Sequence, residues 1–166
     1  VKGVDGDSVP LLELIERIHR VEGLGRIRLG SLEPRIITRE FAEKLAGLPE
    51  FCPHFHLSLQ SGCDATLKRM NRHYTTAVYR RIVDDIRRVF ENPAITTDIM
   101  VGFPGESEEE FSSSLRFCRE LGLSKAHVFS YSRRPGTVAD RMDGQIDPAL
   151  KARRSREMIE AMRASR

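Results

Sequence analysis

The residues best suited to chemistry lie in four short segments, each of which follows an apolar stretch. The segments are GSLEP at 30–34, LQSGCD at 59–64, VGFPGE at 101–106 and SYSRRPGT at 130–137. Each contains glycine, small hydroxyls or side chains that form hydrogen bonds, which bring backbone and polar atoms against a ligand. If the apolar stretches are parallel strands, all four segments lie at one edge of a sheet, where α/β proteins bind ligands.

The segment DIMVGFPGESEEEF at 98–111 has the glycines of a nucleotide-binding loop but not its charge. A phosphate loop of the Walker type requires GxxxxGK followed by Ser or Thr, whereas here Gly105 is followed by Glu106 and by further glutamates. These carboxylates suit the positive end of a helix dipole and would repel a phosphate. The dinucleotide pattern GxGxxG is also missing. We therefore expect Gly102 and Gly105 to let the backbone approach a neutral, flat group, or simply to permit a tight turn.

Two histidines and one aspartate are candidates for other chemistry. His54 and His56 share one face of a strand and could bind a metal ion, as such pairs do in hydrolase barrels. The other three histidines do not fall on strand ends: His19, His73 and His127. Polar lining of the sheet is therefore the stronger interpretation of the pair. Asp98 shares a face with Met100 and Gly102, so these residues either line a ligand or pack inside the protein.

The elements that must position these residues alternate between helices and strands. Apolar spacing predicts helices that begin near Ser8, Thr38, Thr75, Ser107 and Pro148, with a short helical turn at 65–70. Strands are predicted at 26–32, 54–62, 94–103 and 125–132. Strands that alternate with helices pair in parallel through right-handed crossovers. The predicted fold class is α/β, either an open sheet or a partial (β/α) barrel, because these strands are too few to close a barrel of the usual size.

The composition is that of an ordinary globular protein and excludes several classes. The 166 residues are 40% hydrophobic and 31% charged, and no apolar run approaches the ~20 residues needed to cross a bilayer. Cys52, Cys63 and Cys118 match no CxxC or CxxxCxxC spacing, so we interpret them as small apolar residues or unpaired thiols of a cytoplasmic protein. Residues 147–166 hold six cations and three acids, and their excess equals the net charge of +3 of the whole chain. This basic helix is either an RNA-facing segment or a solvated helix face.

Five motifs together resemble the methylthiotransferase family of radical S-adenosylmethionine enzymes. They are RIRLGSLEP, HLSLQSG, LKRMNRHYT, TTDIMVGFPGESEEEF and FSYSRRPGT, in the same order over 26–140. The SLEP stretch and CPHFHLSLQSG are most like the branch that acts on threonylcarbamoyladenosine beside the tRNA anticodon. Sibling branches act on isopentenyladenosine in tRNA or on an aspartate of a ribosomal protein. The resemblance implies a transferase that adds a methylthio group to a modified adenosine.

The resemblance also implies a six-stranded partial (β/α) barrel, of which this chain would supply strands three to six with the helices outside. In this family, cysteines in a CxxxCxxC motif hold a four-iron–four-sulfur cluster that cleaves S-adenosylmethionine to a deoxyadenosyl radical. This chain has no such motif. We therefore expect a fragment that is inactive alone. Residues 1–146 would belong to the radical domain, and the basic helix at 147–166 would lead towards a C-terminal RNA-binding domain.

The resemblance assigns contacts with S-adenosylmethionine to residues at the four strand ends. The candidates for its methionine and ribose portions are Ser31, Glu33, Gln60 and Ser61. The candidates for its adenine are Asp98, Met100, Gly102 and the backbone from Phe129 to Tyr131. Arg134 would bind the methionine carboxylate or an RNA phosphate. A small basic cluster would meet tRNA or form an ordinary helix surface: Lys68, Arg69 and Arg72.

Two other functions stay open on the sequence. A metal-dependent hydrolase would use His54 and His56, and a non-enzymatic RNA-binding module would rely on the basic C-terminal helix. With tRNA and S-adenosylmethionine as partners, we expect no membrane attachment. The absence of the first barrel strands would leave a parallel edge unpaired beside RIRLGSL, so we also expect self-association or domain swapping through that edge.

Overall fold

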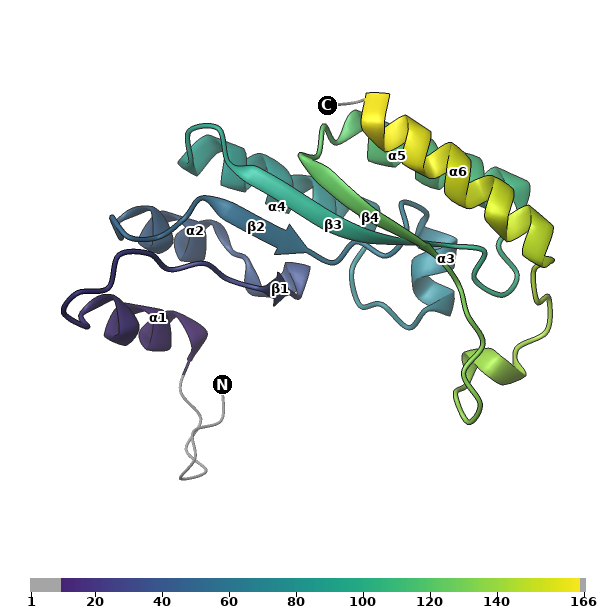
Figure 1. Ribbon diagram of the computed structural model, residues 1–166, viewed down its shortest axis with the longest axis horizontal. Helices are drawn as coiled ribbons and strands as arrows, with labels where there is room; N and C mark the ends of the chain where they lie inside the picture. Colours follow the sequence, from purple (N-terminus) through teal and green to yellow (C-terminus); the bar gives the residue numbers. More distant parts are fainter. Residues whose placement is uncertain (1–9, 165–166) are drawn as a thin grey trace.

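A parallel four-stranded sheet forms the centre of the computed structural model, which describes residues 10–164 (Figure 1). The strands are β1 (Ser31–Leu32), β2 (His54–Leu57), β3 (Ala94–Val101) and β4 (Lys125–Ser130), and they lie in chain order. Each pairs in parallel with the next. The sheet is open, which confirms the predicted α/β class and the partial (β/α) barrel.

Helices connect the strands and begin close to the predicted residues. The α-helices are α1 (Leu11–His19), α2 (Arg39–Ala46), α3 (Asp64–Arg69), α4 (Thr76–Val89), α5 (Glu108–Glu120) and α6 (Pro148–Ala164), and the 3-10 helices are η1 (Pro34–Ile36) and η2 (Ala139–Arg141). Thr38 and Thr75 cap α2 and α4 through their side-chain oxygens. Ser107 and Glu110 form the predicted capping box of α5. Ser8, the predicted start of the first helix, lies outside the described residues.

The first strand is much shorter than predicted. Of the expected span 26–32, only Ser31–Leu32 pairs as a strand, and Ile27 makes an isolated bridge with Phe51. Between the bridge and β2, the Cys52 carbonyl oxygen accepts from the His54 amide at 2.6 Å, so it is not available to pair with the first strand. A short edge strand is a poor template for another chain. The structure therefore offers less edge for self-association than the sequence suggested, and that association stays a prediction.

The core lies between the sheet and the helices that cover one of its faces. Phe55 and Leu57 of β2 are fully buried, as are Ile95 and Ile99 of β3, whereas His54, His56, Asp98 and Met100 on the other face are partly exposed. This alternation confirms the face predicted for Phe55 and Leu57. The hydroxyl of Tyr79 donates to the carbonyl oxygen of Leu57 at 2.9 Å, where β2 leaves the ladder. The helices therefore pack on one face of the sheet and hold it in place, whereas the opposite face, called the open face below, carries partly exposed side chains.

The three cysteines differ in their access to solvent. Cys118 is fully buried in α5, and burial raises the pKa of its thiol to about 12. Cys52 and Cys63 are half-buried, and all three thiols are free, as predicted. Because only an accessible thiolate reacts, we expect N-ethylmaleimide near pH 8 to label two cysteines of the native protein and the third only after denaturation. Intact-mass measurement checks this, and labelling of Cys118 at the rate of the other two would contradict it.

No helix in the described part of the chain is long and apolar enough to cross a membrane.

Candidate functional site

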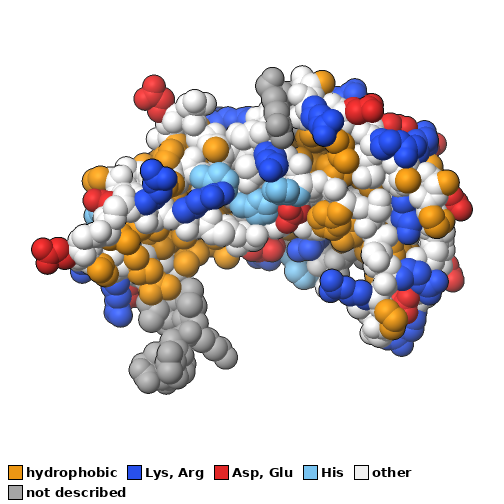
Figure 2. Space-filling model, in the orientation of Figure 1, with side chains coloured by type: hydrophobic (Ala, Val, Ile, Leu, Met, Phe, Trp, Pro, Cys, Tyr) orange, Lys and Arg blue, Asp and Glu red, His pale blue; other side chains and the backbone are white. Residues whose placement is uncertain are grey.

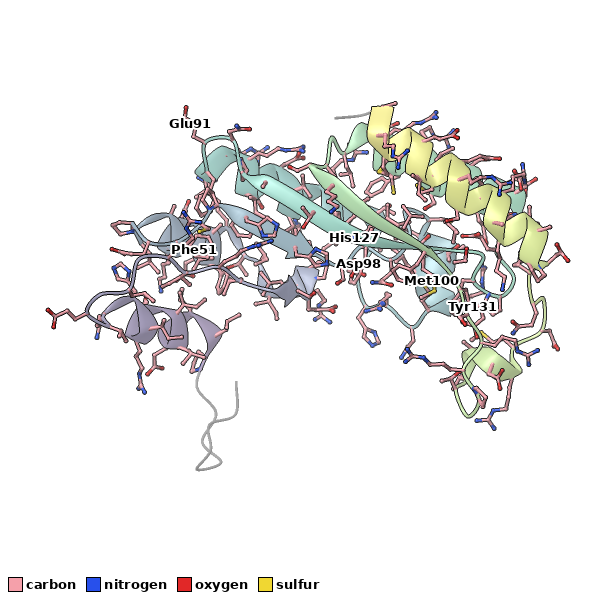
Figure 3. The ribbon with its side chains drawn as sticks, viewed as in Figure 1. Phe51, Glu91, Asp98, Met100, His127 and Tyr131 are labelled. Carbon is pink, nitrogen blue, oxygen red and sulfur yellow. The ribbon has the colours of Figure 1, made fainter. Side chains whose placement is uncertain are left out.

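The open face of the sheet carries rows of side chains that change character from one end of the strands to the other. Residues paired in register across parallel strands point to the same side. From the amino to the carboxyl ends, the rows are Ser31–His56–Thr96–Lys125, then Asp98–His127, then Met100–Phe129. Figure 3 shows His127, Asp98, Met100 and Tyr131 following one another along this face. The face is therefore basic at one end and apolar at the other, with Asp98 between them.

The basic half forms a pocket of about 500 Å³ around the histidines. Arg28 donates from Nε to Nδ1 of His54 at 3.1 Å. His56 lies within hydrogen-bond distance of the hydroxyl of Thr96, at 2.9 Å, and of a carboxylate oxygen of Asp98, at 3.2 Å. In Figure 2 the pale-blue histidine side chains gather at the middle of this face, with lysine and arginine atoms beside them.

These contacts do not favour the metal-dependent hydrolase. The pKa of His54 is lowered by burial, and then by the positive charges of Arg28 and His56. A guanidinium against the imidazole ring would repel a metal cation at the position where a ligand pair must hold it. Within residues 10–164, no group of three or more histidine, cysteine or acidic side chains has the geometry of a metal site. The predicted role of His54 and His56 as polar lining therefore fits their contacts better.

The apolar half forms a second pocket, of about 350 Å³, at the carboxyl ends of β3 and β4. Its lining consists of Met100, Phe129, Ser130, Tyr131, Ser132, Arg134, Thr137 and Ala139. Phe129 is 39% exposed although it is a large apolar residue. The Tyr131 hydroxyl is buried and has no hydrogen-bond partner among the described residues. The exposed ring of Phe129 in an apolar pocket favours a flat ligand with an apolar face.

The loop between β3 and α5 is fixed from behind by Arg154 of α6. Arg154 is 2% exposed and donates from Nη1 to both the carbonyl oxygen and a carboxylate oxygen of Glu106, each at 2.9 Å. The same carboxylate oxygen accepts from the amide of Gly102 at 2.8 Å. Burial raises the pKa of Glu106, and the Gly102 amide and Arg154 oppose that rise. The loop therefore takes its shape from a buried ion pair rather than from a bound phosphate.

Lys151, one turn earlier in α6, reaches the end of both β3 and β4. A Cβ atom on Gly102 would lie 2.3 Å from Cγ of Lys151, so the lysine stem occupies the side on which that atom would stand. The Lys151 ammonium donates to the carbonyl oxygen of Tyr131 at 3.0 Å. Gly102 was predicted to admit a ligand, but the Lys151 stem already occupies its open side, and its amide already donates to Glu106.

The basic helix at 147–166 is accordingly not an open RNA-facing surface. Arg154 is buried, Lys151 is hydrogen-bonded, and Arg153 pairs with Glu108 at 2.9 Å. Only Arg156 and Arg163, among the described cations of α6, are exposed without an ion pair. The helix packs against β4 and α5. A module that binds RNA through this helix is therefore not favoured, and α6 belongs to the same packed layer as the rest of the described chain.

Of the predicted contacts for S-adenosylmethionine, the structure brings four together at the apolar pocket: Met100, Phe129, Tyr131 and Arg134. Asp98 lies beside them on the open face. Ser31 instead lines the basic pocket, and Glu33 is exposed at the start of η1.

Gln60 and Ser61 lie where β2 turns away from the open face. Gln60 has a φ of +67° and bridges two residues of β3 through its backbone. Ser61 is fully buried, and its hydroxyl accepts from the amide of Cys63 at 3.2 Å. Both residues therefore shape the turn, and the structure does not bring the Ser61 hydroxyl to the open site.

Of the predicted RNA contacts, Arg69 is half-buried and paired with Glu110. Its guanidinium donates to both carboxylate oxygens of Glu110, at 2.8 Å for the Nη1–Oε1 contact. Lys68 and Arg72 instead line a surface pocket beside Tyr74. The cluster is therefore divided, with one cation fixed to α5 and two facing outward.

Sequence reasoning missed part of the open face. Lys125 and His127 were not placed there, although the alternation of KAHVFSY would have put both on the side of Phe129. Arg28 and Thr96 were missed as well. For Lys151 and Arg154, no local signal existed, since their partners lie far away in the sequence.

Comparisons with known proteins agree with this geometry. Residues 3–118 match the family described as the Radical SAM superfamily. A tRNA-2-methylthio-N(6)-dimethylallyladenosine synthase from Parafrankia sp. (strain EAN1pec) is 44% identical over 149 residues, covering 90% of this chain and 30% of the relative. Threonylcarbamoyladenosine tRNA methylthiotransferase MtaB of Thermotoga maritima is 40% identical, covering 87% and 33%. The chain thus spans about a third of the length of these relatives.

A solved structure shares the fold. Coproporphyrinogen III oxidase (HemN) from Escherichia coli, a radical SAM enzyme, aligns with a TM-score of 0.74 at 19% identity, covering 93% of this chain and 36% of that one. At this identity the likeness supports the fold alone, and it agrees with the open parallel sheet.

Proposed function

Because this chain belongs to the radical SAM superfamily, we propose that it is the part of a tRNA methylthiotransferase that binds the adenosine of S-adenosylmethionine. The full enzyme would add a methylthio group to a modified adenosine of tRNA, as the names of the relatives state for those proteins. The observation that supports the proposal best is the apolar pocket at the ends of β3 and β4, in which the large apolar ring of Phe129 is exposed.

The residues of this pocket fit an adenosine. Met100 and Phe129 are register partners, so their side chains form one apolar surface on which a flat ring can stack. The strand-end backbone offers donors and acceptors to the edge of the ring. Arg134 would pair with the methionine carboxylate. When bound, S-adenosylmethionine supplies the deoxyadenosyl group and the methyl group of the reaction, and the protein's part is to orient them and to exclude water.

The cysteines of this chain do not fit an iron–sulfur cluster. Cys52 precedes β2 and Cys63 follows it, so they lie at opposite ends of one strand, and Cys118 is fully buried in α5. The cysteines that bind the iron–sulfur cluster lie close together on one loop in the family motif. Such cysteines would have to come from another part of the whole protein. We propose on this basis that the chain alone does not carry out the reaction.

Two finer points also remain proposals. Relatives named for dimethylallyladenosine and for threonylcarbamoyladenosine have similar identities, at 44% and 40%. The assignment to the threonylcarbamoyladenosine branch therefore rests on the SLEP and CPHFHLSLQSG segments. A cytoplasmic location follows from the proposed tRNA substrate.

Titration of the chain with S-adenosylmethionine tests the proposal. We expect saturable binding by calorimetry, weakened about 5- to 150-fold by Phe129→Ala, because stacking of a base on an aromatic ring contributes ~1–3 kcal/mol. Ile18→Ala is a matched control, since Ile18 is also 39% exposed but lies on α1. Lack of saturable binding, or equal affinities for the Phe129 and Ile18 variants, would contradict the proposal.

A further inference from the structure

A basic groove runs over the outer side of the carboxyl edge, away from the pocket just described. It consists of two surface pockets of about 470 and 390 Å³ that share His73 and Val78. The cations in its lining are Arg35, Arg39, Lys68, Arg72 and Arg81, against the acids Asp64 and Asp85. The groove therefore has an excess of positive charge as large as that of the whole chain.

The acids of the basic groove are already engaged. Asp85 pairs with Arg88 at 3.1 Å, and Asp64 accepts from the amide of Thr76 at 2.7 Å. Arg39 pairs with Glu43 at 2.8 Å. The remaining four cations, Arg35, Lys68, Arg72 and Arg81, have no ion pair within residues 10–164. Four cations without an ion pair around one groove are suited to a ligand that carries several negative charges.

The chain topology brings this groove to the edge where the adenosine pocket lies. Arg35 belongs to η1, which directly follows β1, and Lys68 belongs to α3, which follows β2. Arg81 lies in the amino-terminal half of α4, whose carboxyl end leads into the start of β3. All strands are parallel, so these segments share the edge that also holds the ends of β3 and β4. The groove and the apolar pocket thus lie at the same end of the strands, although they share no lining residue.

We propose that the basic groove binds the phosphate backbone of the RNA whose nucleoside is modified. The inference rests on the proposed function, which supplies an RNA substrate, and adds the surface that carries it. Several spaced phosphates match the two connected pockets and their four unpaired cations better than a single anion does. A membrane-binding surface would need exposed apolar residues, and these are sparse here. Among the described residues beside Arg35, Ile36 is the one large apolar residue that is exposed, at 43%.

The test measures binding of a fluorescent anticodon stem-loop RNA by anisotropy at several salt concentrations. Two groove variants are compared with the wild-type chain: Arg35→Gln/Arg81→Gln and Lys68→Gln/Arg72→Gln. The matched control is Arg116→Gln/Arg119→Gln, which removes two exposed cations of α5 on the way to the opposite edge of the sheet. Thermal melts establish that all three variants are folded.

We expect each groove variant to bind the RNA about tenfold more weakly near 100 mM salt. The slope of log affinity against log salt should fall by ~0.7–0.9 for each phosphate contact removed. The control variant should keep both the wild-type affinity and the wild-type slope.

Four outcomes would overturn the proposal. One is equal RNA binding by groove variants and wild type, and another is an equal loss in the control. The third is displacement of the RNA by polyglutamate at equal charge concentration, which would favour an acidic protein as the partner. The fourth is a wild-type chain that binds no RNA. In that case the S-adenosylmethionine titration would still test the proposed function separately.

Discussion

Replacing Arg154 with methionine is expected to lower the free energy of unfolding by about 3–5 kcal/mol, because it leaves the buried carboxylate of Glu106 without its partner. Both side chains are almost fully buried, at 2% and 1% exposed. Methionine fills much of the space against Phe111, over which the guanidinium lies at 5.3 Å. The loss of stability therefore results from the unpaired charge of Glu106 rather than from a cavity. Urea unfolding followed by circular dichroism measures it.

Two further variants separate this effect from general damage to α6. Arg156→Met removes an exposed cation from the same helix and should cost little. The double variant Arg154→Met/Glu106→Gln should regain part of the lost stability, since it removes the unpaired charge as well. If Arg154→Met were as stable as Arg156→Met, the buried ion pair would not support the loop.

The pH dependence of the Arg154→Met variant provides a check on the cause. Burial raises the pKa of Glu106 above that in the unfolded chain, and loss of Arg154 removes a charge that opposes the rise. A raised pKa means that stability is present below the unfolded pKa and is lost as pH rises through the folded one. The deficit relative to Arg156→Met should therefore shrink as pH falls from neutral towards the ordinary range for glutamate. A deficit that does not change with pH would point away from Glu106.

Gly102→Ala is the second substitution for which we expect a large effect, about 2–4 kcal/mol. Gly102 has a φ of +71°, where an alanine is strained by ~1 kcal/mol. The added Cβ would also lie 2.3 Å from Cγ and 2.8 Å from Cδ of Lys151. The middle of the lysine stem must then move, at a cost of ~1–3 kcal/mol for overpacking. That movement also pulls the ammonium from the Tyr131 carbonyl oxygen, so binding of S-adenosylmethionine should weaken.

The chain contains a matched control for the backbone part of this effect. Gly23 has a φ of +79°, and a Cβ there would meet nothing within 4 Å. Gly23→Ala thus measures strain without a clash. Adding Lys151→Ala to Gly102→Ala should relieve the clash but not the strain, so the double-mutant cycle should show coupling. Equal losses for the two glycine variants would contradict the close packing of Lys151 on Gly102.

The sequence determined the parts of this protein that depend on local pattern. Periods of apolar residues located the helices, Thr38, Thr75 and Ser107 marked helix starts, and alternation in β2 identified the buried face. Five colinear motifs indicated the family that the comparison later matched. These features depend on neighbours within a few residues, or on a fixed order of short segments, so a linear reading finds them.

The tertiary structure decided which charged groups are available to a ligand. Arg154 and Glu106 are far apart in sequence, so a helix that is basic in sequence conceals a buried cation. Arg69 is likewise paired with Glu110, which is distant in the sequence. Arg35 and Arg81, in contrast, line one groove together with Lys68 and Arg72. Whether a cation is paired depends on distances between segments that only the packed chain brings together. The sequence by itself thus determined the family and indicated the edge of the sheet at which we propose the site, and only the folded chain determined which charged side chains are paired.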